Sequence, residues 1–357
     1  MDIYFYMSVY DLKQRILKGE SFSKEFVFKE FESYRRKDPV IYNIETTNAC
    51  NMRCEMCPRT TMMTRKIMTM ESDTFKKIAD QIKAYTKEEW EQWQTFVEKK
   101  YNIDRNIMSE NHFFLHIIPQ VIVLHGYGDP LLDKKLPERV KLLTENGIPS
   151  YFSCNPANID VDKNLELFEN GLNYIKYSIE SVDDFTHKEI RGKASNFTNA
   201  YEKIVHLLEM KEKHDYDTEI VITMLDLKKQ NQEKEFKLLE EKFKDLDVYI
   251  YLKSQDQQWY QDKYEGTLSL HWIEFCQFPW SSMTIKSNGE SVMCVEDYNN
   301  EIILGDAKVD SLFDIWNGDK YLQFRKDHFL LTEGIKCSMA CDMKLMGNMN
   351  LSGNLGN

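Results

Sequence analysis

The chain has 357 residues, and its 46 basic and 58 acidic side chains give a formal net charge of −12 at neutral pH. This acidic balance excludes a general nucleic-acid binder, because such a protein neutralises phosphates with lysine and arginine. A hydrophobic share of 42% supplies a buried core and excludes wholesale disorder. No apolar run approaches the roughly 20 residues of a membrane helix, and the start lacks a signal-peptide pattern. We therefore expect a soluble, cytoplasmic protein without a nucleic-acid or membrane partner.

Helical patterns come first along the chain, and strands follow. Residues 1–38 are predicted to be an N-terminal helical segment that acts as a lid or a support. From residue 39 to residue 254, strands alternate with amphipathic helices. The six short apolar strands lie at residues 40–46, 120–126, 149–155, 174–180, 217–224 and 247–253. This alternation indicates βαβ units and a parallel sheet, so we predict an α/β fold, a partial (β/α)6 TIM-like barrel.

Two segments depart from this alternation. Residues 86–118, rich in Trp and Phe, are an insertion that we expect to form its own helices, either as a functional lid or as packing. Residues 255–347 are predicted to be a second domain, in which a β-hairpin with an Asn288-Gly289 turn is followed by helices. The Asn- and Gly-rich tail at 348–357 is expected to be flexible.

Seven of the eight cysteines fall into two groups. Cys50, Cys54 and Cys57 follow the first predicted strand, at the end where parallel α/β folds place their sites. A closed zinc site needs four ligands, and this loop offers three with no nearby His. Three thiolates suit a [4Fe–4S] cluster whose fourth iron lacks a protein ligand and is open to a small molecule. The spacing therefore favours a cluster over structural zinc.

The segment IETTNACNMRCEMCPR, which contains these cysteines, resembles the opening motif of the radical S-adenosylmethionine (SAM) enzymes. The likeness extends from about residue 41 to about residue 252. Tyr127-Gly128-Asp129-Pro130 resembles the GGEP element of that family, with Asp in place of Glu. SCNPA at 153–157 stands at its TNG element, and YSIES at 177–181 with HKEIRG at 187–192 resembles its ribose-side segment.

The resemblance implies a set of cofactor-binding residues. Cys50, Cys54 and Cys57 are then the ligands of a [4Fe–4S] cluster, and the SAM-binding residues are Tyr127, Gly128, Asp129, Asn155, Ser178, Glu180 and Arg191. In this family SAM chelates the open iron, and its reductive cleavage gives a 5′-deoxyadenosyl radical that abstracts hydrogen from the substrate. The resemblance also implies a reductant such as flavodoxin or ferredoxin.

The second group consists of Cys276, Cys294, Cys337 and Cys341. By spacing alone, four thiolates suit either zinc or a fully ligated [4Fe–4S] cluster. This region resembles the SPASM and twitch extensions of radical SAM enzymes, and four cysteines match the shorter twitch type. The resemblance therefore implies an auxiliary [4Fe–4S] cluster, which serves in electron transfer because it has no open iron.

The remaining candidates carry weaker signals. Cys154 is either a small buried hydrophobe or a hydrogen-atom donor to a substrate radical. Glu45, Tyr177, Arg191 and Lys253 lie at or just beyond predicted strand ends, so they are the catalytic candidates for proton transfer.

Three functions fit the sequence. The first is a radical SAM oxidoreductase, a dehydrogenase of a carbohydrate- or cyclitol-like molecule, with the auxiliary cluster as electron acceptor. The second is a radical SAM maturase that crosslinks or epimerises a peptide or protein. The third is a non-catalytic binding protein stapled by zinc. Residues 1–38 are too few for the leader-binding module of many peptide maturases, which favours a small-molecule substrate.

Overall fold

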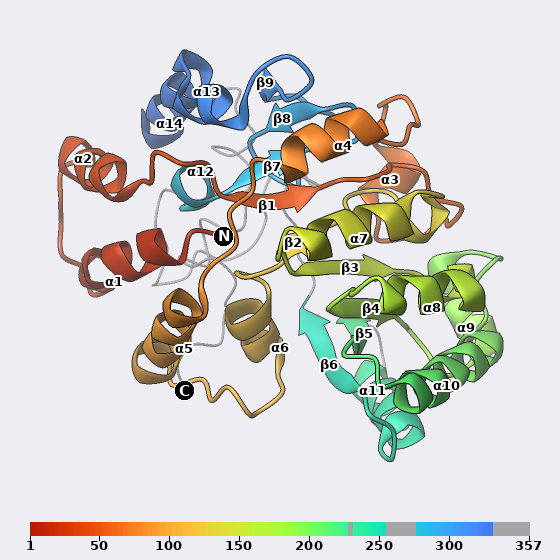
Figure 1. The fold of residues 1–357 in the computed structure, drawn as a ribbon. Helices are drawn as coiled ribbons and strands as arrows, with labels where there is room; N and C mark the ends of the chain where they lie inside the picture. The colour runs from red at the N-terminus through yellow and green to blue at the C-terminus, as the bar shows by residue number, and fades with distance from the viewer. Residues whose placement is uncertain (228–230, 255–275, 331–357) are drawn as a thin grey trace.

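The computed structural model describes residues 1–227, 231–254 and 276–330 (Figure 1). Six strands lie side by side in sequence order, and each is parallel to the next. They are β1 (Ile41–Ile44), β2 (Ile122–Val123), β3 (Ser150–Cys154), β4 (Tyr174–Ser178), β5 (Glu219–Asp226) and β6 (Tyr249–Ser254). The predicted α/β partial barrel is thus confirmed, and β6 forms one end of an open sheet.

Helices follow the strands and cover the outer face of the sheet (Figure 1). They are α3 (Pro58–Thr61), α4 (Ser72–Ala79), α7 (Leu136–Glu145), α8 (Val161–Glu169), α9 (Asp184–Arg191), α10 (Phe197–His214) and α11 (Gln232–Phe243), with short 3-10 turns η2 (Pro130–Leu132) and η3 (Pro156–Asn158). Asp160, Asp183 and Asn196 start three of these helices by accepting a hydrogen bond from a first-turn amide. Within the described ranges, no helix combines the length and the apolar character needed to cross a bilayer.

The C-terminal part extends the sheet of the barrel. Strand β7 (Met283–Ile285) pairs in parallel with β1, and β8 (Glu290–Val292) and β9 (Ile303–Asp306) continue it antiparallel. Gly289 has a φ of +85° in the predicted hairpin turn, which glycine adopts without strain. Helices α12 (Phe278–Ser281), α13 (Leu312–Asn317) and α14 (Asp319–Leu330) pack around this hairpin. The region predicted as a second domain therefore shares one nine-stranded sheet with the barrel.

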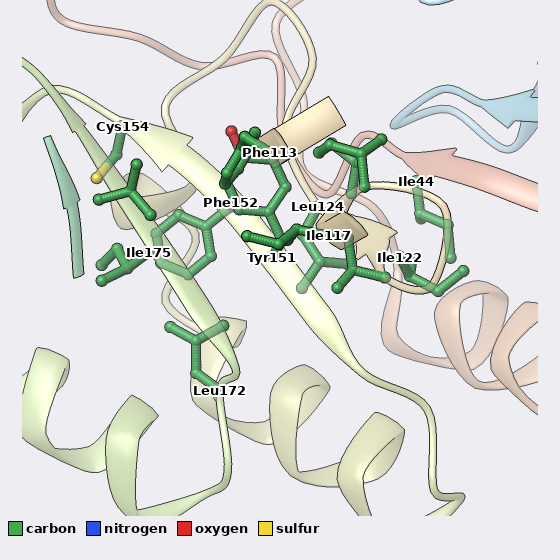
Figure 2. Packing of buried hydrophobic residues seen from close by; sticks show 14 of the residues in the cluster. Ile44, Phe113, Ile117, Ile122, Leu124, Tyr151, Phe152, Cys154, Leu172 and Ile175 are labelled. Carbon is green, nitrogen blue, oxygen red and sulfur yellow. The ribbon is translucent and has the colours of Figure 1, made fainter. Parts of the chain in front are cut away.

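The insertion forms helices, as expected, and enters the core. It contains α5 (Lys87–Tyr101), α6 (Glu110–His112) and the π-helical turn η1 (Phe113–Ile117). Trp93, fully buried in α5, donates from its indole nitrogen to the Leu115 carbonyl at 2.7 Å. Phe113 packs edge-to-face on Tyr151 of β3, with 5.3 Å between ring centroids (Figure 2). The insertion is thus tied to the inside of the barrel.

The N-terminal helices act as a support for the C-terminal part. Asp2 caps α1 (Ile3–Leu17), and α2 (Lys24–Tyr34) packs against it. Their buried aromatic rings meet Trp280 of α12 and Phe329 of α14 in a small second core, in which Phe31 stands 5.3 Å from Trp280. The larger core lies under the barrel strands, where Ile44, Ile122, Phe152 and Ile175 are packed together (Figure 2).

A buried ion pair joins the barrel, the cysteine loop and the hairpin. Glu45 follows β1 and is fully buried, and Arg65 donates to both of its carboxylate oxygens at 2.7 and 2.8 Å. The same carboxylate accepts from the Tyr127 amide, which follows β2, and from the amide and hydroxyl of Ser287 in the hairpin. Arg65 also donates to the Tyr298 carbonyl at 2.7 Å. One carboxylate therefore holds four segments that are distant in sequence.

Phe31→Ala should destabilise the protein, because it removes a ring from the centre of the second core. Truncation of a buried Phe costs about 3–5 kcal/mol of unfolding free energy. Phe185→Ala is the matched control, since Phe185 is 70% exposed and its loss should leave stability almost unchanged. Chemical denaturation followed by circular dichroism measures both variants. Equal midpoints for the two would contradict the assignment of Phe31 to a core.

Glu45→Gln should destabilise the protein most at neutral pH. Burial alone raises the pKa of Glu45, but the hydrogen bonds of Arg65 and the charges of Lys286 and Arg65 outweigh it and lower that pKa to about 2. A depressed carboxyl pKa adds stability above the ordinary pKa near 4.5, and this stability is lost as the pH falls toward 2. The shift corresponds to about 3 kcal/mol at pH 7.

Denaturation midpoints at pH 7 and pH 3 test this expectation. The difference between wild type and Glu45→Gln should shrink at the lower pH. Glu20→Gln, which breaks an exposed pair with Arg15, is the control and should leave the midpoint unchanged at both pH values. A Glu45→Gln difference that is independent of pH would refute the ionic role of this carboxylate.

Candidate active site

The cysteine loop between β1 and α3 is fixed by hydrogen bonds to its own return segment and to α9. Asn48 donates to the Lys66 carbonyl at 2.9 Å and accepts from the Met68 amide at 2.7 Å. The Arg53 and Glu55 amides donate to carbonyls at the end of α9, at 3.2 and 3.0 Å. The loop is therefore anchored on both sides, although it contains little regular structure.

The thiols of Cys50 and Cys57 lack the lowered pKa of a reactive cysteine, and those of Cys50 and Cys54 accept hydrogen bonds. Burial raises the pKa of Cys50 to about 11 and also raises that of Cys57, whereas a reactive cysteine has a lowered pKa. The Met52 amide donates to the Cys50 sulfur at 3.4 Å, and Arg191 donates to the Cys54 sulfur at 3.8 Å. Hydrogen bonds of this kind tune the sulfurs of iron–sulfur clusters.

All three thiols face one cavity of about 310 Å³, which we call the outer cavity. In the described part of the chain, no three His, Cys, Asp or Glu side chains are grouped to hold a single metal ion. A [4Fe–4S] cluster does not require side chains that converge on a single metal ion, because each thiolate binds its own iron. The donor set and the shared cavity thus fit a cluster with one open iron better than they fit zinc.

The structure brings every predicted SAM-binding residue to this cavity. Its wall contains Cys50, Cys54, Cys57, Tyr127, Gly128, Asp129, Asn155, Ser178, Glu180 and Arg191, and also His125, Gly126, Ser153, Cys154, Lys176, Thr223, Leu225 and Lys253. Most of these residues lie at or after the carboxyl ends of β1 to β6, and Arg191 ends α9. Their roles in SAM binding remain predictions, but all of the predicted residues line the same cavity.

Gly128 allows the end of β2 to approach the cysteine loop. A Cβ atom at this position would lie 2.1 Å from the Thr47 carbonyl oxygen, which is too close for any side chain. The neighbouring Asp129 amide donates to the Ala49 carbonyl at 2.8 Å. The Asp129 carboxylate accepts from the amides of Leu131 and Asn155, and burial raises its pKa. The GGEP-like element is thus packed directly on the loop.

Two buried donors in the outer cavity have no protein partner. Asn155 accepts from the Ala157 amide through its oxygen, which leaves its Nδ2 atom unpaired. Arg191 binds Glu180 and Cys54 through its terminal nitrogens, which leaves its Nε atom unpaired. Orphaned buried donors are rare in folded proteins, and a ligand often satisfies them. A carboxylate or hydroxyl of SAM in this cavity would supply the missing acceptors.

The other predicted cofactor residues have partners within the protein. Both carboxylate oxygens of Glu180 are bonded, one to Arg191 and the other to the Leu225 amide at 2.9 Å. Ser178 lies 3.4 Å from the Ser153 hydroxyl. The Tyr127 hydroxyl donates to Glu296 at 2.7 Å, which links the barrel to the segment after Cys294.

A second cavity of about 230 Å³, the inner cavity, continues from the outer one into the barrel. The two share His125, Gly126, Tyr127, Lys176 and Lys253. The remaining wall of the inner cavity is formed by Tyr42, Asn43, Phe113, Phe114, Ile118, Val123, Tyr151, Val295 and Glu296. Aromatic rings from the insertion and a segment beside Cys294 thus border the same space.

The four catalytic candidates occupy different surroundings. Glu45 is committed to its ion pair with Arg65, and Arg191 to Glu180 and Cys54. Tyr177 is fully buried and directs its hydroxyl to Asn164 at 2.7 Å. Lys253 is the one of these four candidates that lines both cavities. None of these placements tests a catalytic role.

Two of the four predicted auxiliary ligands lie in the described part of the chain. Cys276 precedes α12, and its amide donates to His328 of α14 at 2.9 Å. Cys294 follows β8 and is buried. Cys337 and Cys341, like the predicted tail at 348–357, lie outside the described residues. The auxiliary ligand set therefore remains a prediction.

Sequence reasoning missed several polar residues of the cavity walls. Asn43 in β1, His125 after β2 and Lys176 in β4 were not among the predicted site residues. The missed signal is a polar side chain inside an otherwise apolar strand, as in VIYNIET and YIKYSIE. Such a residue must face either a partner or a cavity, because an unpaired buried polar group is costly.

Comparison with known proteins agrees with this geometry. The model of the radical SAM superfamily matches residues 44–240, and that of an iron–sulfur cluster-binding domain, SPASM, matches residues 276–342. No curated protein sequence matches the chain.

Solved structures share the fold at low sequence identity. Native anSMEcpe with bound AdoMet is 14% identical over 85% of this chain and 90% of its own, with a TM-score of 0.51. Streptococcus suis SuiB bound to S-adenosylmethionine is 12% identical over 97% and 86%, with a TM-score of 0.52. BtrN in complex with AdoMet and 2-DOIA is 16% identical over 84% and 93%, with a TM-score of 0.47.

The family match covers more than half of the chain and includes the cysteine loop and all the strand ends of the outer cavity up to β5. The chain therefore belongs to the radical SAM superfamily, with the [4Fe–4S] cluster and SAM of that family as cofactors, and it carries a C-terminal SPASM domain for auxiliary iron–sulfur binding.

Proposed function

We propose that the chain is a radical SAM oxidoreductase that dehydrogenates a small alcohol of the carbohydrate or cyclitol type in the inner cavity. One observation carries this proposal: the inner cavity adjoins the outer cavity on one side and Val295–Glu296, next to Cys294, on the other. A substrate in this space lies between the cysteine loop and a predicted ligand of the auxiliary cluster. An electron acceptor beside the substrate is what a dehydrogenase requires.

The size of the inner cavity supports a small substrate. Its volume of about 230 Å³ is below the roughly 300–1,000 Å³ of pockets for drug-sized ligands. One ring or one side chain suits a space of this size. Structures of anSMEcpe and SuiB contain a Cp18Cys peptide and the precursor peptide SuiA. A single peptide side chain in the inner cavity is therefore the alternative.

When bound, SAM and its cluster supply a 5′-deoxyadenosyl radical that takes one hydrogen atom from the carbinol carbon, and the auxiliary cluster supplies the acceptor for one electron. The substrate loses the hydroxyl proton as well, so C–H and O–H bonds break and a C=O bond forms. The residues of the inner cavity orient the alcohol and exclude water. Lys253 is our candidate to accept the hydroxyl proton at Nζ, in its neutral amine form, because it borders both cavities.

Single cysteine variants should separate the two clusters. Wild type with two [4Fe–4S] clusters binds about eight irons per chain. Cys54→Ala should retain about four and lose SAM cleavage, whereas Cys294→Ala should retain about four and keep SAM cleavage. Cys154→Ala is the matched control and should retain the wild-type iron content. Iron analysis and 5′-deoxyadenosine assays of anaerobic protein measure these outcomes, and full iron loading in Cys294→Ala would contradict the auxiliary cluster.

Deuterium transfer tests the proposed substrate class. Reduced enzyme with SAM should transfer deuterium from a carbinol-deuterated cyclitol or sugar into 5′-deoxyadenosine and form the ketone in equal amount. Mass spectrometry detects both products. Cys294→Ala should still transfer deuterium but form little ketone, since the electron then lacks its acceptor. Deuterium transfer from a labelled peptide, with none from any alcohol, would replace this proposal by the maturase alternative.

A further inference from the structure

Asn43 presents an unpaired acceptor to the inner cavity. This residue of β1 is fully buried, and its Nδ2 atom donates to the carbonyls of Val123 at 3.1 Å and His125 at 2.5 Å. These two bonds fix the orientation of the amide, and its Oδ1 atom has no partner. An orphaned buried acceptor is costly and rare in folded proteins, so its presence in a cavity wall points to a ligand that donates to it.

His125 presents a donor to the same cavity. Its Nδ1 atom accepts from the Ser153 amide at 3.0 Å, so the proton of the neutral ring lies on Nε2. Burial and the charge of Lys176 lower the pKa of His125 to about 3, which keeps the ring neutral at physiological pH. The ring also packs edge-to-face on Tyr151, with 5.3 Å between centroids. Its orientation and tautomer are therefore both fixed before a ligand binds.

We propose that Asn43 and His125 are the specificity-determining pair of the inner cavity and that they select a neutral six-membered polyol. This inference rests on the proposed function and names the substrate class of that site. A hydroxyl group donates to Asn43 Oδ1 and accepts from His125 Nε2, so neighbouring hydroxyls on one ring satisfy both residues.

Charged ligands match this pair less well. A carboxylate or phosphate satisfies His125 and meets Lys176 and Lys253, but it places negative charge against the Asn43 oxygen and beside Glu296. An ammonium group satisfies Asn43 and meets Glu296, but it faces the His125 donor and both lysines. The aromatic rings of Phe113 and Tyr151 also border the cavity and offer apolar surface to the C–H groups of a ring. Lys176, whose ammonium lies 5.5 Å from the Phe113 centroid, can donate to hydroxyl lone pairs as well.

Calorimetric binding to the anaerobic holoenzyme with SAM and without reductant tests the pair. The probes are myo-inositol, D-glucose and D-galactose, each beside its monodeoxy analogues, with gluconate as the anionic probe. For at least one polyol, a particular deoxy analogue should bind wild type at least tenfold more weakly, which corresponds to about 1.4 kcal/mol. The His125→Phe variant should bind the intact polyol at least tenfold more weakly than wild type does. It should bind the intact polyol and the deoxy analogue with equal affinity.

His116→Phe is the matched control, because His116 is a buried histidine outside both cavities and should leave the affinity ratio intact. Asn43→Leu is a second variant. It should also remove the preference for a polyol over its deoxy analogue, but for an analogue that lacks a different hydroxyl. If it fails to fold, the His125→Phe ratio decides alone. Three outcomes would overturn the inference. They are an unchanged ratio of polyol to deoxy-analogue affinity in His125→Phe, tighter binding of gluconate than of the polyols by wild type, and binding of none of the polyols.

The outcomes also separate this inference from the proposed function. Polyol binding and dehydrogenation with an unchanged ratio in His125→Phe refute the role of the pair and leave the oxidoreductase standing. Deuterium transfer from a peptide alone refutes both.

Discussion

The carboxylate of Glu45 is the constraint on which the arrangement of the site depends. It is fully buried, and Arg65, Tyr127 and Ser287 converge on it from the segment after α3, from the end of β2 and from the hairpin. Removal of any one partner leaves a buried charge less well compensated, so each of the three segments stabilises the arrangement of the others. Glycine at position 126 belongs to the same constraint, because a Cβ there would lie 2.4 Å from the Glu45 carboxylate. The ion pair thus sets the distance between the cysteine loop and the hairpin that carries Cys294.

This junction joins the hairpin that carries Cys294 to the sheet that carries the cysteine loop. Strand β7 pairs with β1, so the hairpin is an extension of the barrel sheet and not a separately hinged body. The Tyr127 hydroxyl reaches Glu296, and Lys286 donates to the Val295 carbonyl at 2.8 Å, so the segment after Cys294 is held against the cavity walls. In a barrel without this extension, the inner cavity would be open on that side.

The cysteine loop and the GGEP-like element could be predicted from the sequence, because their chemistry depends on the spacing of residues close together in the chain. The parallel order of six strands was also predictable, since alternation of strands and helices leaves few topologies. The pairing of β7 with β1 was not, because hydrophobic patterning identifies a strand but not its distant partner. Asn43 was missed because site residues were sought at strand ends, whereas Asn43 lies within β1. His125 follows β2, and nothing in its local sequence distinguishes it from a buried core histidine.

The two cavities follow from the two-residue period of the strands. Val123, Tyr151 and Lys176 face the inner cavity, and residues two positions later, His125, Ser153 and Ser178, face the outer one. Because side chains alternate across a sheet, each step of two residues moves one layer along the barrel interior. His125 and Lys176 border both layers, so they lie where the outer and the inner cavity meet. A polar side chain at such a layer boundary can contact the reacting partners without leaving the rigid frame of the sheet.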